Sequence, residues 1–194
     1  MKSVVVALDP GPEMTGVAVI EAGRIVRAAN LANKVLFNII LTLAPKDTLQ
    51  VLIEDVRAYD GRLSQDLIDT CKWIGELTYR LKTVKIAPEL IPRSTVKSWI
   101  FRTFPEISIP RIEKKIIARD RRKLDGEYCK PSAIYVDDRI VEAAMKEKWS
   151  IPTPKPGQTN MYGLKTHSWQ ALALASCYLS TTHEEVPASR ICCR

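Results

Sequence analysis

Two acidic side chains stand where short apolar runs end, and they are the first candidates for chemistry. Asp9 follows the run VVVAL, and Glu54 follows the run VLI. An ionised carboxylate is costly to bury beside such neighbours unless a cation or hydrogen bonds compensate it. If the two runs are adjacent strands, the carboxylates form the oxygen pair that a hard divalent cation prefers. The alternatives are an Asp9 that caps its own turn and a Glu54 that pairs with Arg57 or Arg93.

The turn after Asp9 carries two glycines, in the stretch LDPGPEMTG. Gly11 lets the backbone come close to whatever Asp9 binds, and Gly16 suits tight packing or a special backbone angle. This arrangement favours a binding site at the end of the first apolar run.

A third group of polar residues lies far along the chain, at the start of a predicted helix. His167 and Gln170 are three residues apart and therefore share one helical face. The alanines at 171, 173 and 175 allow this helix to lie close against a sheet. The alternative interpretation of His167 is a polar residue that helps to cap the helix.

Hydrophobic periodicity predicts the elements that must position these residues. Strands are expected at 2–8, 15–20, 24–29, 49–53 and 83–91. Helices are expected at 33–43, 64–81 (with Leu67, Ile68, Cys71, Ile74, Leu77 and Leu81 on one face), 94–102 (capped by Ser94), 135–149 and 166–179. Three antiparallel strands followed by strand–helix–strand predict an α/β fold, with a mixed five-stranded sheet and helices on both faces.

Length and composition indicate one globular domain, at 1–180, with a basic insertion at about 105–132 and a flexible tail at 181–194. The net charge of +7 suits a polyanionic partner. No apolar run is long enough to span a bilayer, and no export signal is present. The five cysteines include no CxxC pair, which predicts reduced thiols in a cytoplasmic protein and no zinc site.

The basic insertion is predicted to contact phosphates, because residues 111–123 carry seven basic and two acidic side chains. Tyr59 is a candidate for stacking on an unpaired base, and an ordinary loop aromatic is the equally weighted alternative. A solvated charged helix is the alternative interpretation of the insertion. The predicted nucleic-acid contacts are Arg57, Tyr59, Arg93, Lys97, Lys114, Lys115, Arg121, Arg122 and Lys165.

Four motifs in order carry a family resemblance: DPGPEMTG, LIEDV, PRSTVK and a polar-x-x-polar-ALALA helix. Together they resemble the RuvC-type Holliday junction resolvases of the RNase H-like superfamily, over most of the chain. The resemblance implies an RNase H-like fold and metal-dependent hydrolysis of four-way DNA junctions, with Mg²⁺ or Mn²⁺ as cofactor. A junction that needs two symmetric cuts also suits a homodimer. The implied location is the cytoplasm of a bacterial host, in a nucleoid-associated or phage-encoded protein.

The resemblance also assigns roles to the candidate residues. Asp9 and Glu54 match the first two family carboxylates, and His167 matches a position that is Asp or His. Asp9 would bridge metals, Glu54 would hold one, and His167 would ligate a metal or orient the attacking water. Gln170 stands where the family has its last Asp, and an amide is a weaker ligand and no general base. Three alternatives stay open: a site that works with fewer acids, a weakened site, or an acid recruited from the preceding helix (Asp137, Asp138 or Glu142), of which Asp138 is the predicted metal ligand.

Three other functions compete with the junction resolvase. A catalytically weak or inactive junction-binding protein is favoured by Gln170, and an RNase H-like nuclease for another nucleic-acid structure would share the same motifs. A sugar-kinase or actin-like ATPase also begins with a strand-end Asp and a Gly turn. That third class is disfavoured, because the chain is too short for two such domains and lacks a second Asp-Gly phosphate motif.

Overall fold

A computed structural model provides the fold. It describes residues 4–56, 63–113, 136–152, 164 and 166–183.

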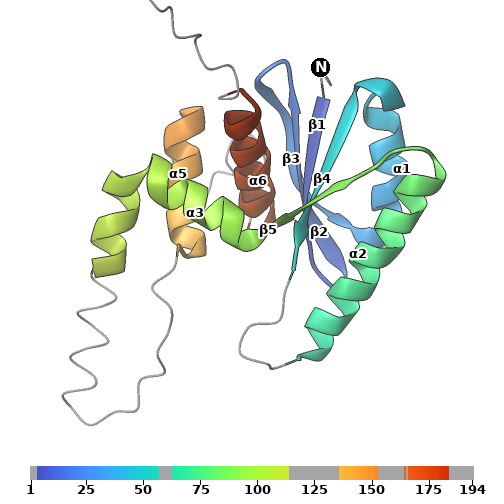
Figure 1. Ribbon diagram of the computed structural model, residues 1–194, viewed down its shortest axis with the longest axis horizontal. Helices are drawn as coiled ribbons and strands as arrows, with labels where there is room; N and C mark the ends of the chain where they lie inside the picture. The colour runs from blue at the N-terminus through green and yellow to red at the C-terminus, as the bar shows by residue number, and fades with distance from the viewer. Residues whose placement is uncertain (1–3, 57–62, 114–135, 153–163, 165, 184–194) are drawn as a thin grey trace, which may run out of the picture.

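A mixed five-stranded sheet forms the centre of the molecule (Figure 1). β1 (Val4–Pro10), β2 (Met14–Glu21) and β3 (Arg24–Ala32) form an antiparallel meander. β4 (Leu49–Asp55) then pairs parallel to β1, and β5 (Glu89–Pro92) pairs parallel to β4. The resulting order is β3-β2-β1-β4-β5, so the two strands that end in candidate acids are neighbours at the centre.

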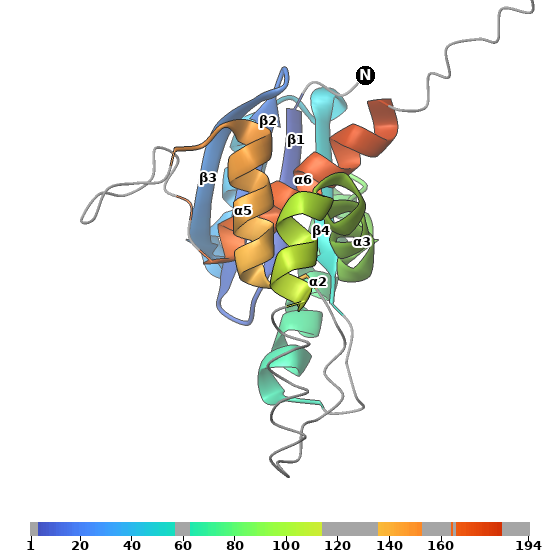
Figure 2. The same ribbon diagram turned by 90° about the vertical axis from the view of Figure 1, so that its left-hand side faces the viewer.

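Helices cover both faces of this sheet, as the sequence predicts (Figures 1 and 2). One face carries α1 (Asn33–Leu43) and α2 (Gln65–Thr83). The other face carries α3 (Arg93–Thr103), α5 (Asp138–Trp149) and α6 (Thr166–His183). A short 3₁₀ turn (Lys46–Thr48) precedes β4, and a further helix covers 105–113. Within the described part of the chain, none of these helices combines the length and apolarity needed to cross a membrane.

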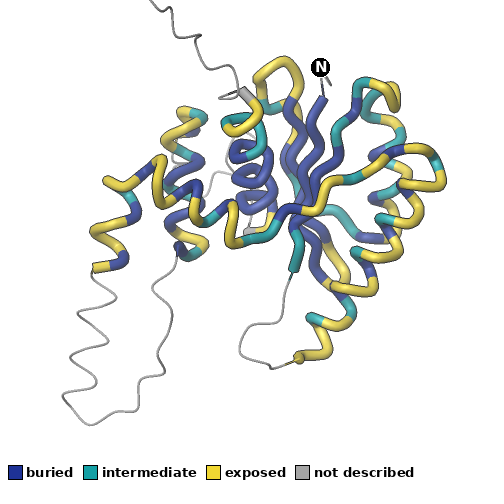
Figure 3. Tube along the Cα trace, in the orientation of Figure 1, coloured by how far each residue is buried: buried dark blue, intermediate teal, exposed yellow. Residues whose placement is uncertain are grey.

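Side-chain alternation along the strands divides the apolar core into two clusters. Val5 and Ala7 of β1 pack with α3, α5 and α6, whereas Val6 and Leu8 pack with α1 and α2. The central strands and much of α6 are therefore buried, while the outer side of α2 is exposed (Figure 3). The same alternation places Asp9 on the face that α6 covers.

Most predicted elements are present, and their ends differ in informative ways. The predicted bounds of α1 are confirmed, whereas α6 runs to His183 and so includes three residues expected in the tail. The prediction of a strand at 83–91 was too long, because α2 continues to Thr83 and only four residues pair with β4. Ser94 does not cap α3: the helix begins one residue earlier, after Pro92, with no side-chain cap hydrogen bond.

The predicted buried face of α2 was also partly wrong. Leu77 and Leu81 are buried as expected, but Thr70 and Trp73 complete the face, and Cys71 is exposed. The helix is therefore rotated relative to the apolar pattern, and the reason is a polar contact. The Trp73 indole Nε1 donates a hydrogen bond to Thr15 Oγ1 at 3.1 Å across the core.

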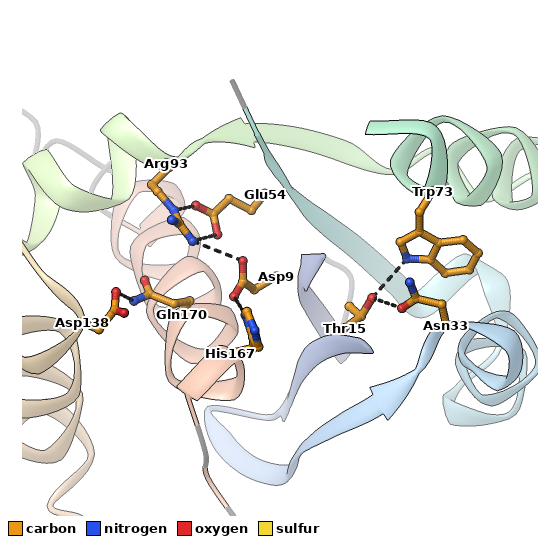
Figure 4. Close-up of polar contacts among 9 residues, drawn as sticks. All are labelled: Asp9, Thr15, Asn33, Glu54, Trp73, Arg93, Asp138, His167 and Gln170. Carbon is orange, nitrogen blue, oxygen red and sulfur yellow. Dashed lines mark hydrogen bonds and ion pairs between the residues drawn. The ribbon is translucent and has the colours of Figure 1, made fainter. Parts of the chain in front are cut away.

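This contact belongs to a buried network that fixes the turn after Asp9 (Figure 4). Thr15 Oγ1 donates to Asn33 Oδ1 at 2.7 Å. Asn33 Nδ2 donates to the carbonyl oxygens of Gly11 and Pro12, at 3.0 and 3.1 Å. Asn33, the first residue of α1, thus gives two turn carbonyls a hydrogen-bond donor. Through Thr15 the same network connects the turn to Trp73 of α2.

Replacing Asn33 by Ala should therefore destabilise the protein. The substitution leaves Thr15 and two turn carbonyls without their partner, and each unsatisfied buried group costs about 1–3 kcal/mol. We expect a loss of about 2 kcal/mol or more in the free energy of unfolding, measured by urea denaturation. Asn38→Ala on the exposed side of the same helix is the matched control and should change stability little. Equal stability of the two variants would contradict the role given to Asn33.

Candidate active site

Asp9 and Glu54 lie side by side at the ends of two parallel central strands. Leu8 pairs with Ile53 in the register of β1 and β4, so the next residue of each strand is one of the two acids. Both are nearly inaccessible, with 2% of Asp9 and 3% of Glu54 exposed. The prediction that the two apolar runs are neighbouring strands is confirmed.

His167 reaches the acid pair from α6, which crosses β1 and β2. Its Nδ1 lies 2.8 Å from Asp9 Oδ2, and about half of its side chain is exposed. The hydrogen bond to Asp9 raises the pKa of the imidazole, although partial burial opposes the shift. The capping interpretation of His167 therefore does not account for its place, since its ring points at the acid (Figure 4).

Gly16 is the reason that α6 comes this close. It pairs with Asp9 across β1 and β2, directly beneath the start of α6. A Cβ atom on Gly16 would lie 2.3 Å from the carbonyl carbon of His167 and 2.4 Å from its oxygen. A methyl group does not fit there, so the glycine sets the distance between the helix and the sheet.

Arg93 lies between the two acids, although the sequence suggested it as a DNA contact. Its Nε donates to Glu54 Oε1 in a short ion pair, and its Nη2 lies 3.4 Å from both Glu54 Oε2 and Asp9 Oδ1 (Figure 4). Arg93 is the first residue of α3, and β5 carries it past Glu54. The salt bridge from Glu54 to Arg93 was one of the alternatives that the sequence left open.

One guanidinium does not fully balance two buried carboxylates. Burial and the neighbouring Asp9 raise the pKa of the Glu54 carboxyl, Arg93 lowers it by less, and the net pKa is about 8. Burial lowers the pKa of Arg93, but the Glu54 and Asp9 carboxylates outweigh this, and the net shift is upward. Near neutral pH Glu54 therefore favours its protonated form, because Arg93 compensates only one of the two buried carboxylates.

Gln170 and Asp138 meet beside this acid pair. Gln170 Nε2 donates to Asp138 Oδ1 at 2.8 Å, which joins α6 to the first turn of α5 (Figure 4). Asp137, the preceding residue, instead caps α5 by accepting a hydrogen bond from the Ile140 N–H at 2.9 Å. Of the two adjacent acids, Asp138 is thus the one whose side chain contacts Gln170.

Burial and Arg93 lower the pKa of Lys97, a predicted phosphate contact that lies half-buried on α3. The remaining predicted nucleic-acid contacts lie outside the described residues: Arg57, Tyr59, Lys114, Lys115, Arg121, Arg122 and Lys165.

The donor types at this site fit a hard divalent cation. Two carboxylates supply the oxygen ligands that such a cation prefers, an imidazole lies beside them, and Arg93 compensates only part of their charge. As the side chains stand, no three His, Cys, Asp or Glu groups among the described residues form a ready-made cluster. The guanidinium of Arg93 lies between Asp9 and Glu54.

The meander, the two parallel strands and the helix across the sheet together define an RNase H-like α/β fold. Within this class the chain has a RuvC-like fold. It is similar to Thermus thermophilus RuvC in complex with a Holliday junction substrate, with a TM-score of 0.58 and 11% identity over 94% of this chain and 96% of that one. A second Thermus thermophilus RuvC structure gives a TM-score of 0.54 and 13% identity over 93% of this chain and 96% of that one.

No protein-family model matches the sequence, and no curated protein matches it either. The likeness is therefore one of fold.

Gly16→Ala tests whether the close contact with α6 positions the site. The added methyl must push α6 away from β2, and overpacking of this kind costs about 1–3 kcal/mol. We expect the free energy of unfolding to fall by about that amount. Gly75→Ala is the matched control: it lies on the exposed side of α2, no described atom lies within 4 Å of the new Cβ, and the variant should gain up to about 1 kcal/mol. If both variants are equally stable, α6 does not depend on Gly16.

Proposed function

We propose that this protein is a metal-dependent DNA endonuclease that resolves four-way junctions. The observation that carries the proposal is the buried Asp9–Glu54 pair, placed on the sheet face covered by α6 and contacted by His167. A RuvC-like fold supports the same conclusion, since one similar structure is a RuvC bound to a Holliday junction substrate.

Asp9 and Glu54 would hold a Mg²⁺ or Mn²⁺ ion, with His167 and Asp138 as further ligands. Such an ion polarises a scissile phosphate, lowers the pKa of an attacking water and stabilises the leaving oxygen. The strands fix both carboxylates, so the acids are preorganised and lose little side-chain freedom when they bind a cation. The imidazole, half exposed, is placed to ligate the ion or to orient water next to Asp9.

Asp138 supplies the acid that Gln170 does not. In this proposal the acidic ligand comes from α5 and not from α6, and the Gln170 amide holds the Asp138 carboxylate by a hydrogen bond. Asp138 also raises the pKa of His167, to a lesser degree than Asp9 does, and this supports a role for Asp138 near the ion. Gln170 is therefore a positioning residue in this proposal, as metal ligands are commonly oriented by hydrogen bonds from a second layer of residues.

The substrate would be bound through its phosphates. The net charge of +7 supports a DNA partner, and Lys97 and the basic segment at 111–123 supply candidate cations. A homodimer, which would place two sites on one junction, stays a prediction.

A second candidate function is junction binding without cleavage. It is favoured by Arg93, because a guanidinium that contacts both acids at the position of a shared ion would leave a site able to bind DNA but not to hydrolyse it.

Cleavage of a labelled four-way junction separates the two functions. With Mg²⁺ or Mn²⁺ we expect paired symmetric nicks, and none with EDTA. Asp9→Asn should lower the rate about a thousandfold, since losing roughly 4 kcal/mol of transition-state stabilisation corresponds to that factor. Linear duplex and an RNA–DNA hybrid should be cut poorly. Tight junction binding with no cleavage under either metal would instead establish the binding protein.

Asp138→Asn tests whether the acid on α5 belongs to the site. We expect cleavage to slow about 10–100-fold, the usual cost of a weakened ligand or its support, with little change in stability. The matched control is Asp137→Asn, one residue earlier, which should retain activity because Asn caps a helix as well as Asp. Equal rates for the two variants would remove Asp138 from the proposed ligands.

A further inference from the structure

The position of Arg93 has a consequence for cation binding. Its guanidinium contacts one oxygen of Asp9 and both oxygens of Glu54, and these acids come from two different strands. The carboxylates are almost fully buried, whereas 36% of the arginine side chain is exposed. The acids are thus fixed by the sheet, while the guanidinium of Arg93 reaches them from the solvent side on a long side chain.

A divalent ion and the guanidinium need the same space. Nη2 of Arg93 stands 3.4 Å from Asp9 Oδ1 and 3.4 Å from Glu54 Oε2, which places it between the two acids. Oxygen ligands hold Mg²⁺ or Ca²⁺ at roughly 2.0–2.6 Å, so an ion shared by these oxygens would overlap the guanidinium. Two positive groups in one buried position would also repel each other strongly.

Arg93 can leave without unfolding the protein. It is the first residue of α3, and its side chain makes the described ion pairs only with the two acids. The backbone of β5 and α3 can stay in place while the side chain rotates outward, where a DNA phosphate would be a suitable new partner for a guanidinium.

We propose that Arg93 and a divalent cation are alternative occupants of the Asp9–Glu54 pair, so that the arginine acts as a built-in competitor of the metal. It partly compensates the charge of the acids in the free protein, and a metal must displace it in order to bind. This inference rests on the proposed function for the identity of the ion, but it concerns binding and not cleavage.

Calorimetric titration of the metal-free protein with Mn²⁺ tests the competition directly. Arg93→Gln keeps much of the side-chain length and removes the charge, so we expect Mn²⁺ to bind about tenfold tighter or more, within the usual range of coupling between two ligands. Arg102→Gln, on the exposed end of the same helix, is the matched control and should leave the affinity unchanged. Unchanged or weaker Mn²⁺ binding by Arg93→Gln would overturn the proposal.

A second measurement uses the unmodified protein, and so does not depend on whether the variant folds. The Nε–H group of Arg93 should give a protected NMR signal in the metal-free protein, because it is held by Glu54. Saturation with Mg²⁺ should shift this signal and speed its exchange with water. A signal that stays protected at saturation would show that both cations fit together. Neither measurement requires DNA. Junction binding without cleavage would therefore refute the proposed function, while the two metal-binding measurements would still decide whether Arg93 competes with the ion.

Discussion

The structure depends on two carboxylates that the sheet holds in a buried position. Parallel pairing of β1 with β4 brings Asp9 and Glu54 together, and neither side chain can move far without breaking that register. Their charge must be compensated, because an isolated buried carboxylate is strongly disfavoured. The neighbouring elements answer this need: α3 supplies Arg93, and α6 supplies His167. The same demand that makes the pair costly for folding makes it a strong site for a cation.

The fold and the acid pair could be predicted from the sequence because their signals are local. Each strand is a short apolar run, and the acids stand at the ends of two of them, so pattern and topology lead to the same place. The pairing register of β4 with β5 could not be predicted from the apolar pattern. Four residues of β5 pair with β4, and this short segment decides that Arg93 lies at the acids and not on an outer surface. The sequence identified Arg93 as a cation but could not say which anion it meets.

The polar network of Thr15, Asn33 and Trp73 shows the other limit of sequence patterns. Apolar periodicity oriented α2 by its aliphatic residues, whereas the helix is rotated to bring the Trp73 indole to Thr15. A buried hydrogen bond between residues 58 positions apart leaves no periodic trace in the sequence. Similarly, the sequence named Asp137, Asp138 and Glu142 as candidate acids near Gln170, and only the packing of α5 against α6 shows that Asp138 is the one that Gln170 contacts.

The contact between Asp9 and His167 joins residues 158 positions apart, nearly the whole length of the chain. During synthesis the strands and α1 leave the ribosome well before α6, the helix that completes the site. A partly made chain therefore exposes an acid pair without its histidine, and also without the α6 surface that buries it. Assembly of the site thus coincides with completion of the core, so an unfinished or truncated chain that lacks α6 lacks the site as well.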